Sequence, residues 1–214
     1  VPAGKREVLS KWGWPDEHPH WNWKGHEGET LTVRAYSRCD SVRLYLNGEC
    51  LGTKIVSARL AADFEVPFSV GCLMAVGIRD GREVAHKSLQ TTGRPCRLVL
   101  LPEKQIVSAD PNDLAYVKVC VADEEGRIVP DATVRLKMTV EGDGILLASG
   151  NAAPDDMRSF RNPACSTHQG KCLAILQPGT KSGTMLLKVV AEGMPAVETE
   201  IRIASVKYEP AFIH

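Results

Sequence analysis

The sequence has no long apolar run and no excess of charge of either sign. No stretch approaches the ~20 consecutive apolar residues that a membrane-spanning helix needs, and the chain does not open with the pattern of a signal peptide. The 26 Lys and Arg residues are balanced by 26 Asp and Glu residues. Without net charge, the chain lacks the basic footprint typical of proteins that bind nucleic acid or anionic membranes. We therefore expect neither nucleic acid nor a membrane as a partner.

Cysteine pairs with C-x-x-C spacing are also absent, which argues against a zinc ribbon or a thioredoxin-like redox site. Several cysteines stand where a strand would place a small apolar residue, as Cys120 does between Val119 and Val121. We interpret the cysteines as free buried thiols, with one incidental disulfide as the alternative. The seven are Cys39, Cys50, Cys72, Cys96, Cys120, Cys165 and Cys172.

No motif of a self-sufficient catalytic or cofactor site is present. The chain contains neither the G-x-S-x-G elbow of serine hydrolases nor a glycine-rich nucleotide-binding motif. Asp155 and Asp156 are adjacent in one loop, so they do not form the pair of carboxylates about 5 Å apart that a retaining glycosidase needs. Ser166 and His168 are interpreted as a chance proximity. We predict no catalytic residue, no bound metal and no cofactor, and hence no enzyme activity for this chain on its own.

What the chain does have is apolar alternation with a period of two residues along most of its length. Residues 31–36 and 42–47 alternate in this way in the first half, and residues 114–121, 133–140 and 197–203 contain β-rich or alternating runs in the second. Asn47-Gly48 and Asp80-Gly81 supply the positive φ angles that tight hairpin turns require. Short strands separated by turn residues are typical of sandwiches rather than of βαβ units.

The periodic signal lapses around residues 91–95, where glycine and proline appear together as in an interdomain linker. We therefore predict an all-β fold with two tandem immunoglobulin-like β-sandwich domains, residues 1–92 and 93–214. The first carries a Trp-rich N-terminal segment. The less regular stretch from Gly150 to Gly170 is predicted to be a long loop.

All four tryptophans fall within twelve residues near the N-terminus. Exposed indoles can stack on sugar rings, but such rings can equally fill the end of a small sandwich or an interface with a neighbouring domain. Both interpretations stay open. The candidate interdomain or sugar-binding residues are Trp12, Trp14, His20, Trp21 and Trp23.

Three imidazoles, those of His18, His20 and His26, lie in or near the same stretch. Three histidines can hold zinc. In an extended chain, however, His18-Pro19-His20 would place its two imidazoles on opposite faces, which disfavours a metal site. We therefore predict none.

Two ordered motifs resemble a known family. The first runs through His18-Pro19-His20-Trp21-Asn22-Trp23, Gly25, Glu27-Gly28 and Leu46-Asn47-Gly48, and the second through Ala109-Asp110, Val129-Pro130-Asp131-Ala132, Gly150-Asn151 and Gly170-Lys171-Cys172. Together they resemble the domains that follow the catalytic barrel in a bacterial branch of glycoside hydrolase family 2, the β-galactosidase family. One departure is Ala152, which stands where the family motif has a glycine.

The resemblance implies that the catalytic glutamates lie in an upstream (α/β)₈ barrel, for which this chain has neither the length nor the periodicity. The start at Val1 without Met then suggests a portion of a longer polypeptide. The expected partner is the catalytic barrel of the parent chain, while carbohydrate and a second copy of the chain remain open. The family is commonly exported, so the resemblance implies a periplasmic or secreted location.

The leading hypothesis is therefore a noncatalytic C-terminal pair of sandwiches of a β-galactosidase-like retaining glycoside hydrolase. It would support the barrel and help to shape its substrate cleft. An independent carbohydrate-binding module that uses the Trp12–Trp23 cluster is the alternative, and an adhesin-like interaction protein is a weaker third option, because fold alone does not decide function.

Overall fold

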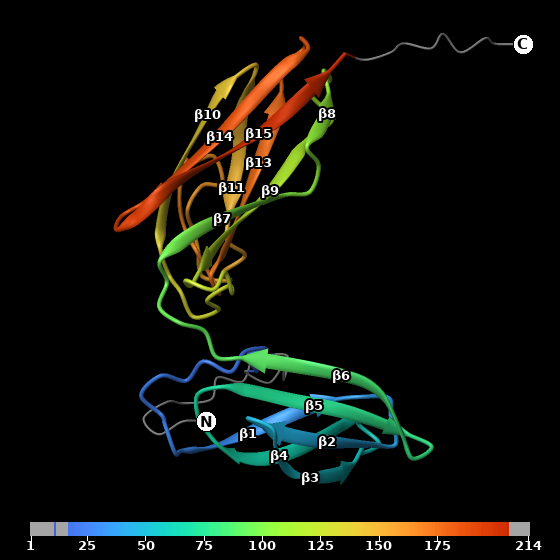
Figure 1. The fold of residues 1–214 in the computed structure, drawn as a ribbon. Helices are drawn as coiled ribbons and strands as arrows, with labels where there is room; N and C mark the ends of the chain where they lie inside the picture. Colours follow the sequence, from blue (N-terminus) through green and yellow to red (C-terminus); the bar gives the residue numbers. More distant parts are fainter. Residues whose placement is uncertain (1–10, 12–16, 206–214) are drawn as a thin grey trace, which may run out of the picture. The chain divides into compact units, whose positions relative to one another are not determined.

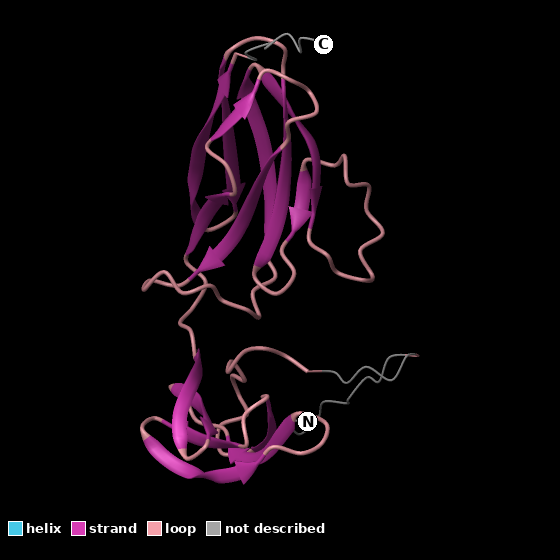
Figure 2. Ribbon diagram, turned by 90° about the vertical axis from the view of Figure 1, so that its right-hand side faces the viewer, coloured by secondary structure: helices cyan, strands magenta, loops and turns pink. Residues whose placement is uncertain are grey.

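The computed structural model describes residue 11 and residues 17–205 (Figure 1). The chain divides into two compact units, residues 1–91 and residues 92–214. Every regular element in the described residues is a β-strand (Figure 2), which confirms the prediction of an all-β fold. Among these residues no helix has the length and apolar character needed to cross a bilayer.

The N-terminal unit contains two antiparallel sheets. One pairs β1 with β4, and the other has the strand order β3-β2-β5-β6. Apolar side chains alternate along β2 and β4, so each strand places one face against the core. The strands are β1 (Thr30–Tyr36), β2 (Ser41–Leu46), β3 (Glu49–Ile55), β4 (Ala61–Pro67), β5 (Cys72–Arg79) and β6 (Arg82–Gln90).

The two hairpin turns expected from the sequence are present. Asn47 and Gly48, between β2 and β3, have φ angles of 52° and 86°, and Asp80 and Gly81, between β5 and β6, have φ angles of 51° and 73°. Two successive residues with positive φ form the turn type whose twist matches that of the strands it joins. These dipeptides therefore set the register of both hairpins.

The C-terminal unit is a sandwich of a five-stranded and a four-stranded sheet, with the orders β12-β10-β14-β15-β8 and β11-β13-β9-β7. All neighbouring pairs are antiparallel except β15 and β8. The strands are β7 (Arg97–Pro102), β8 (Ile106–Ser108), β9 (Ala115–Ala122), β10 (Arg135–Gly142), β11 (Gly144–Gly150), β12 (Ala164–Ser166), β13 (Lys171–Pro178), β14 (Gly183–Ala191) and β15 (Met194–Ala204).

The core of the C-terminal unit is built from the inward faces of both sheets. Val117 and Val119 on β9 meet Leu187 and Val189 on β14, and all four side chains are fully buried. The stretch predicted to be a long loop, residues 150–170, is interrupted by the three-residue strand β12. This strand adds to the edge of the five-stranded sheet by pairing with β10, a long-range contact that local alternation does not reveal.

Candidate functional site

The segment before β1 carries the candidate residues of the N-terminal unit. Trp12 and Trp14 lie outside the described residues. Trp21 is only 2% exposed, its Nε1 donates a hydrogen bond to the carbonyl oxygen of Ser69 (2.9 Å), and its ring meets that of Phe68 edge to face. The Thr91 hydroxyl donates to the Trp21 carbonyl oxygen at 2.8 Å. Trp21 is therefore a core residue and presents no free ring face to a sugar or a neighbouring domain.

Trp23 is half-buried and belongs to a small ring cluster. Its centroid lies 5.2 Å from that of His20 and 5.9 Å from that of His18, and the two imidazole centroids are 5.4 Å apart. The sequence-based expectation that the two imidazoles lie on opposite faces is wrong. The chain is not extended here, because the His20 N–H donates to the His18 carbonyl oxygen (2.9 Å) and closes a tight turn around Pro19.

The histidines of this segment are not gathered with further metal-binding side chains in the described residues. No group of three or more His, Cys, Asp or Glu residues with suitable geometry occurs in the described part of the chain. The His26 backbone N–H donates to the Trp23 carbonyl oxygen (3.0 Å), and its imidazole lies against Glu29, with 3.1 Å between Nδ1 and Oε2. His18, His20 and Trp23 form a cluster of aromatic rings in tilted and edge-on contact.

A polar network fixes the beginning of the same segment to the β1–β4 sheet. Arg34 donates two hydrogen bonds to the Asp63 carboxylate, at 2.7 and 3.0 Å, and a third to Glu17 at 2.8 Å. The Tyr36 hydroxyl donates to the other oxygen of Glu17. The hydrogen bonds from Arg34 lower the pKa of Asp63. Residues 17–21 are therefore held at both ends, by Glu17 and by Trp21.

The C-terminal unit has an open hollow of about 470 Å³ beside the loop that follows β11. Asn151 shapes this loop, because its amide donates to the Ser166 carbonyl oxygen (2.8 Å) and its side-chain oxygen accepts from the Ala153 N–H (2.9 Å). Most of the residues that line it have polar or charged side chains. The lining comprises Thr133, Arg135, Asn151, Ala153, Asp155, Asp156, Arg158, Ser166, Thr167 and His168.

One carboxyl group in the hollow, that of Asp156, has a lowered pKa. A glycosidase centre needs a carboxyl group whose pKa is raised so that it can donate a proton. The Arg158 side chain instead hydrogen-bonds Asp156 and holds the pKa of that carboxyl far below its usual range. Elsewhere among the described residues, each carboxyl with a displaced pKa is displaced downward: Asp63, Asp113 and Asp123.

The hollow gathers residues that the sequence analysis treated separately or missed. Asp155 and Asp156 precede β12 in the chain, and they line the hollow together with Ser166, the last residue of β12, and His168, which follows it. Arg135 and Arg158 were not identified from the sequence. No local signal could have found Arg135, since it lies on β10 and reaches the hollow only because β12 pairs with that strand.

Two family models match the chain, one in each unit. Residues 98–200 match the glycoside hydrolase family 2 C-terminal domain 5, and residues 28–85 match a domain of unknown function, DUF4982. A β-galactosidase of Bacteroides ovatus, BoGH2A, is 33% identical over 178 residues, which is 82% of this chain and 21% of that protein. The chain belongs to glycoside hydrolase family 2. The match to C-terminal domain 5 places it in the C-terminal region of these proteins, as the two motifs predicted.

Solved structures of glycoside hydrolase family 2 agree. A member from Bacteroides cellulosilyticus has a TM-score of 0.88 and 31% identity, covering 95% of this chain and 27% of that one. A β-glucuronidase of the family has a TM-score of 0.82 and 26% identity, covering 89% of this chain and 20% of that one. This chain spans about a fifth of the length of the curated relatives it matches.

The family motif also explains the backbone at Ala152. This residue replaces the glycine of the motif and adopts a φ of 61°. The loop therefore has a left-handed conformation at this position, which glycine adopts without steric penalty and which an L-residue with a side chain adopts only with strain. Asn151 hydrogen bonds on both sides of Ala152 hold the loop in this form.

Proposed function

We propose that this chain is a noncatalytic C-terminal part of a β-galactosidase-like retaining glycoside hydrolase and that it supports the catalytic barrel. The observation that carries the proposal is the match of both units to family 2 relatives about five times as long. In the hollow, the lowered pKa of Asp156 suits an ionised carboxylate rather than a proton donor, which supports the proposal. The reacting groups then belong to the barrel.

The contact with the barrel is assigned to the ring cluster of His18, His20 and Trp23. Trp23 is partly buried and His18 is exposed, so the cluster offers aromatic surface that a second domain can cover. Glu17 and Trp21 fix the chain on both sides of His18 and His20. A surface held in this way loses little side-chain entropy when a partner binds.

A sugar-stacking role for the Trp-rich segment has less support. Trp21 is closed off by Ser69 and Phe68, and Trp23 already contacts two imidazoles, that of His20 in a tilted and that of His18 in an edge-on arrangement. A carbohydrate platform needs an open ring face.

We also propose that the chain works outside the cytoplasm, in the periplasm or the medium, as the family implies.

The chain alone should not hydrolyse 4-nitrophenyl β-D-galactoside, whereas the BoGH2A β-galactosidase serves as the positive control. Titration with galactosides while following tryptophan emission should give a flat response. Turnover that co-purifies with the chain through successive columns overturns the noncatalytic assignment. Saturable quenching that disappears in Trp23→Ala overturns the supporting role in favour of sugar binding.

A second measurement tests the contact with the barrel. Trp23→Ala is compared in the isolated chain and in the polypeptide that also contains the barrel. Docking predicts a larger loss of thermal stability in the longer polypeptide, because there the ring also loses its partner across the interface. Equal losses in both contexts rule out this contact surface.

A further inference from the structure

Two cysteines from opposite sheets of the C-terminal unit meet inside its core. Cys165 lies on β12 of the five-stranded sheet and Cys172 on β13 of the four-stranded sheet, and both are buried. The Cys172 thiol donates to Cys165 with 2.8 Å between the sulfur atoms. This separation is within about 1 Å of the ~2.05 Å of a bonded pair. The remaining cysteines of the described chain have no comparable contact with each other.

The backbone holds this pair from both sides. Between the two cysteines, the buried Thr167 side chain accepts from the Val134 N–H (2.9 Å) and donates to the Ala132 carbonyl oxygen (2.8 Å). At the turn, the Gly170 N–H donates to the same Ala132 oxygen, and the Gly170 carbonyl oxygen accepts from the Val121 N–H. These hydrogen bonds hold the residues between Cys165 and Cys172 against neighbouring parts of the chain. The two sulfur atoms therefore face each other without rearrangement of the sandwich.

The surroundings of Cys165 favour its reaction. The hydrogen bond from Cys172 lowers the pKa of Cys165 against the opposing effect of burial, and the Arg158 guanidinium adds to the lowering. The same hydrogen bond, together with burial, raises the pKa of Cys172. One thiolate beside one thiol is the state from which disulfide exchange begins.

A reagent approaches Cys165 from beneath the loop that follows β11. The thiol lines a small cavity of about 10 Å³ together with Arg158 and Phe160 of that loop. Phe160 is largely exposed on its outer side, and Met157 is 92% exposed. A small-molecule disulfide is larger than this cavity, so the loop has to open before the reagent reaches the sulfur.

We propose that Cys165 and Cys172 are a reversible disulfide site that joins the two sheets of the C-terminal unit. With a glutathione disulfide as oxidant, the Cys165 thiolate attacks one sulfur and releases one glutathione thiolate. Cys172 then loses its proton and attacks the Cys165 sulfur of the mixed disulfide, which releases the second glutathione. Two protein thiols thus lose two electrons and two protons, and one glutathione disulfide becomes two thiols. A dithiol reductant reverses the reaction.

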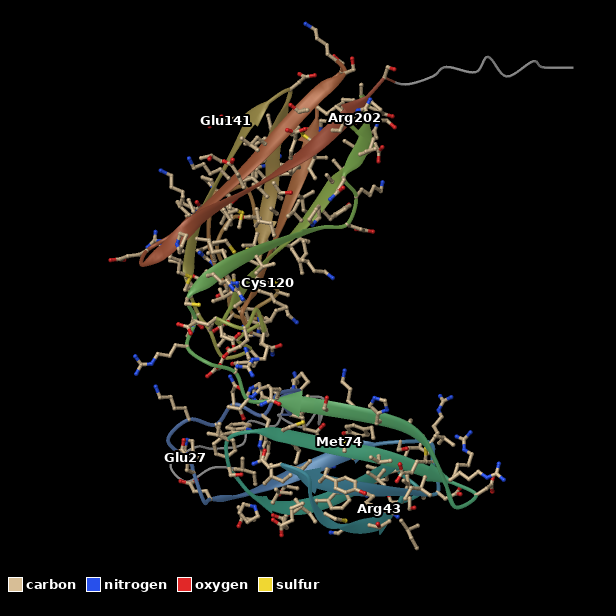
Figure 3. The ribbon with its side chains drawn as sticks, in the orientation of Figure 1. Glu27, Arg43, Met74, Cys120, Glu141 and Arg202 are labelled. Atoms are coloured by element: carbon tan, nitrogen blue, oxygen red, sulfur yellow. The ribbon has the colours of Figure 1, made fainter. Side chains whose placement is uncertain are left out.

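The Cys165–Cys172 pair differs from the other cysteines because each of its thiols faces a second thiol. Cys120, on β9 (Figure 3), is also buried, and burial raises its pKa, but no second cysteine faces it in the described structure. Cys50 is exposed and has no thiol neighbour there either. An oxidant should therefore produce different products at these positions: an internal bond at Cys165 and Cys172, a glutathione adduct at Cys50, and no change at Cys120.

The experiment treats the folded chain with oxidised glutathione, alkylates the remaining thiols and digests with trypsin. Cleavage after Arg161, Lys171 and Lys181 separates the two cysteines, so a bond between them links the peptides 162–171 and 172–181. We expect this linked pair and a mass loss of two hydrogens. Absence of the linked pair when Cys50 is fully modified overturns the proposal, as does a glutathione adduct that persists on Cys165.

Two variants distinguish the Cys165–Cys172 disulfide from oxidation of other cysteines. Cys172→Ala should abolish the linked pair, and Cys120→Ala should leave it unchanged. Oxidation should raise the unfolding temperature of the C-terminal unit by roughly 5–10 °C, because the bond restricts the unfolded chain, and dithiothreitol should reverse the shift. A linked pair that forms only in urea overturns the proposal, since the folded backbone would then not bring the two sulfurs together.

Discussion

The indole of Trp21 meets the ring of Phe68 edge to face inside the core of the N-terminal unit, with centroids 5.1 Å apart and planes at 69°. Phe68 also exchanges two backbone hydrogen bonds with the segment that carries Trp21, through Gly28 and Glu29. Trp21 is therefore part of the core of the N-terminal unit, although its sequence surroundings are typical of an irregular segment.

Trp21→Ala should lower the free energy of unfolding of the N-terminal unit by about 3–5 kcal/mol, the usual cost of truncating a large buried ring. Urea unfolding followed by tryptophan emission reports this unit alone, since all four tryptophans lie in it. The half-buried Trp23→Ala serves as the matched control and should cost clearly less in the isolated chain. A Trp21→Ala cost below that of Trp23→Ala would contradict the core assignment.

Ala152→Gly should stabilise the C-terminal unit by roughly 0.5–1 kcal/mol, because glycine removes the strain of a positive φ but adds freedom to the unfolded chain. Calorimetric unfolding should show a rise of a few degrees. Ala153→Gly is the control, since Ala153 has no positive φ and the substitution should not stabilise. Equal effects at both positions would show that the strain at Ala152 is negligible.

Asp123 should make the C-terminal unit sensitive to acid. Its side chain is fully buried, which by itself raises the pKa, but hydrogen bonds from the Gly93 and Arg127 N–H groups and the Arg127 guanidinium outweigh burial and lower the pKa to about 2. A carboxyl with a folded pKa below its unfolded value of 3.8 stabilises the fold above pH 4. That contribution, about 2 kcal/mol, disappears as the pH falls from about 4 to about 2.

The measurement is the unfolding free energy of the wild-type chain and of Asp123→Asn between pH 2 and pH 7. The difference between them should be largest at neutral pH and should shrink toward pH 2. Asp113, whose pKa is also lowered to about 2, chiefly by the Ser108 N–H, titrates in the same range and remains in both proteins. A difference that is independent of pH would refute the role assigned to Asp123.

Gly170→Ala should destabilise the C-terminal unit by at least about 2 kcal/mol, since the residue has a φ of 70° and an added Cβ would lie 2.1 Å from the Val129 carbonyl oxygen. Gly183→Ala is the control, because its φ is not positive and no atom lies within 4 Å of an added Cβ. Thermal unfolding should separate the two variants by several degrees, and similar midpoints would contradict the close approach at Gly170.

The strands and hairpins were predictable because their signals are local. Alternation with a period of two marks β2, β10 and β15, and the dipeptides at 47–48 and 80–81 consist of residue types that tolerate the positive φ angles of the turns. The family motifs are likewise readable from residue order. By contrast, the short strands β8 and β12 have only three residues each and owe their existence to pairing with β15 and β10.

The sequence alone determined the all-β class, the hairpin turns and the family, because each depends on residues close together in the chain. Only the tertiary structure decided which tryptophan is core and which is half-buried, that His18 and His20 share one face, and that Cys165 and Cys172 meet. These outcomes depend on which strands from distant parts of the chain become neighbours, and burial and contact are properties of that assembly rather than of any single segment.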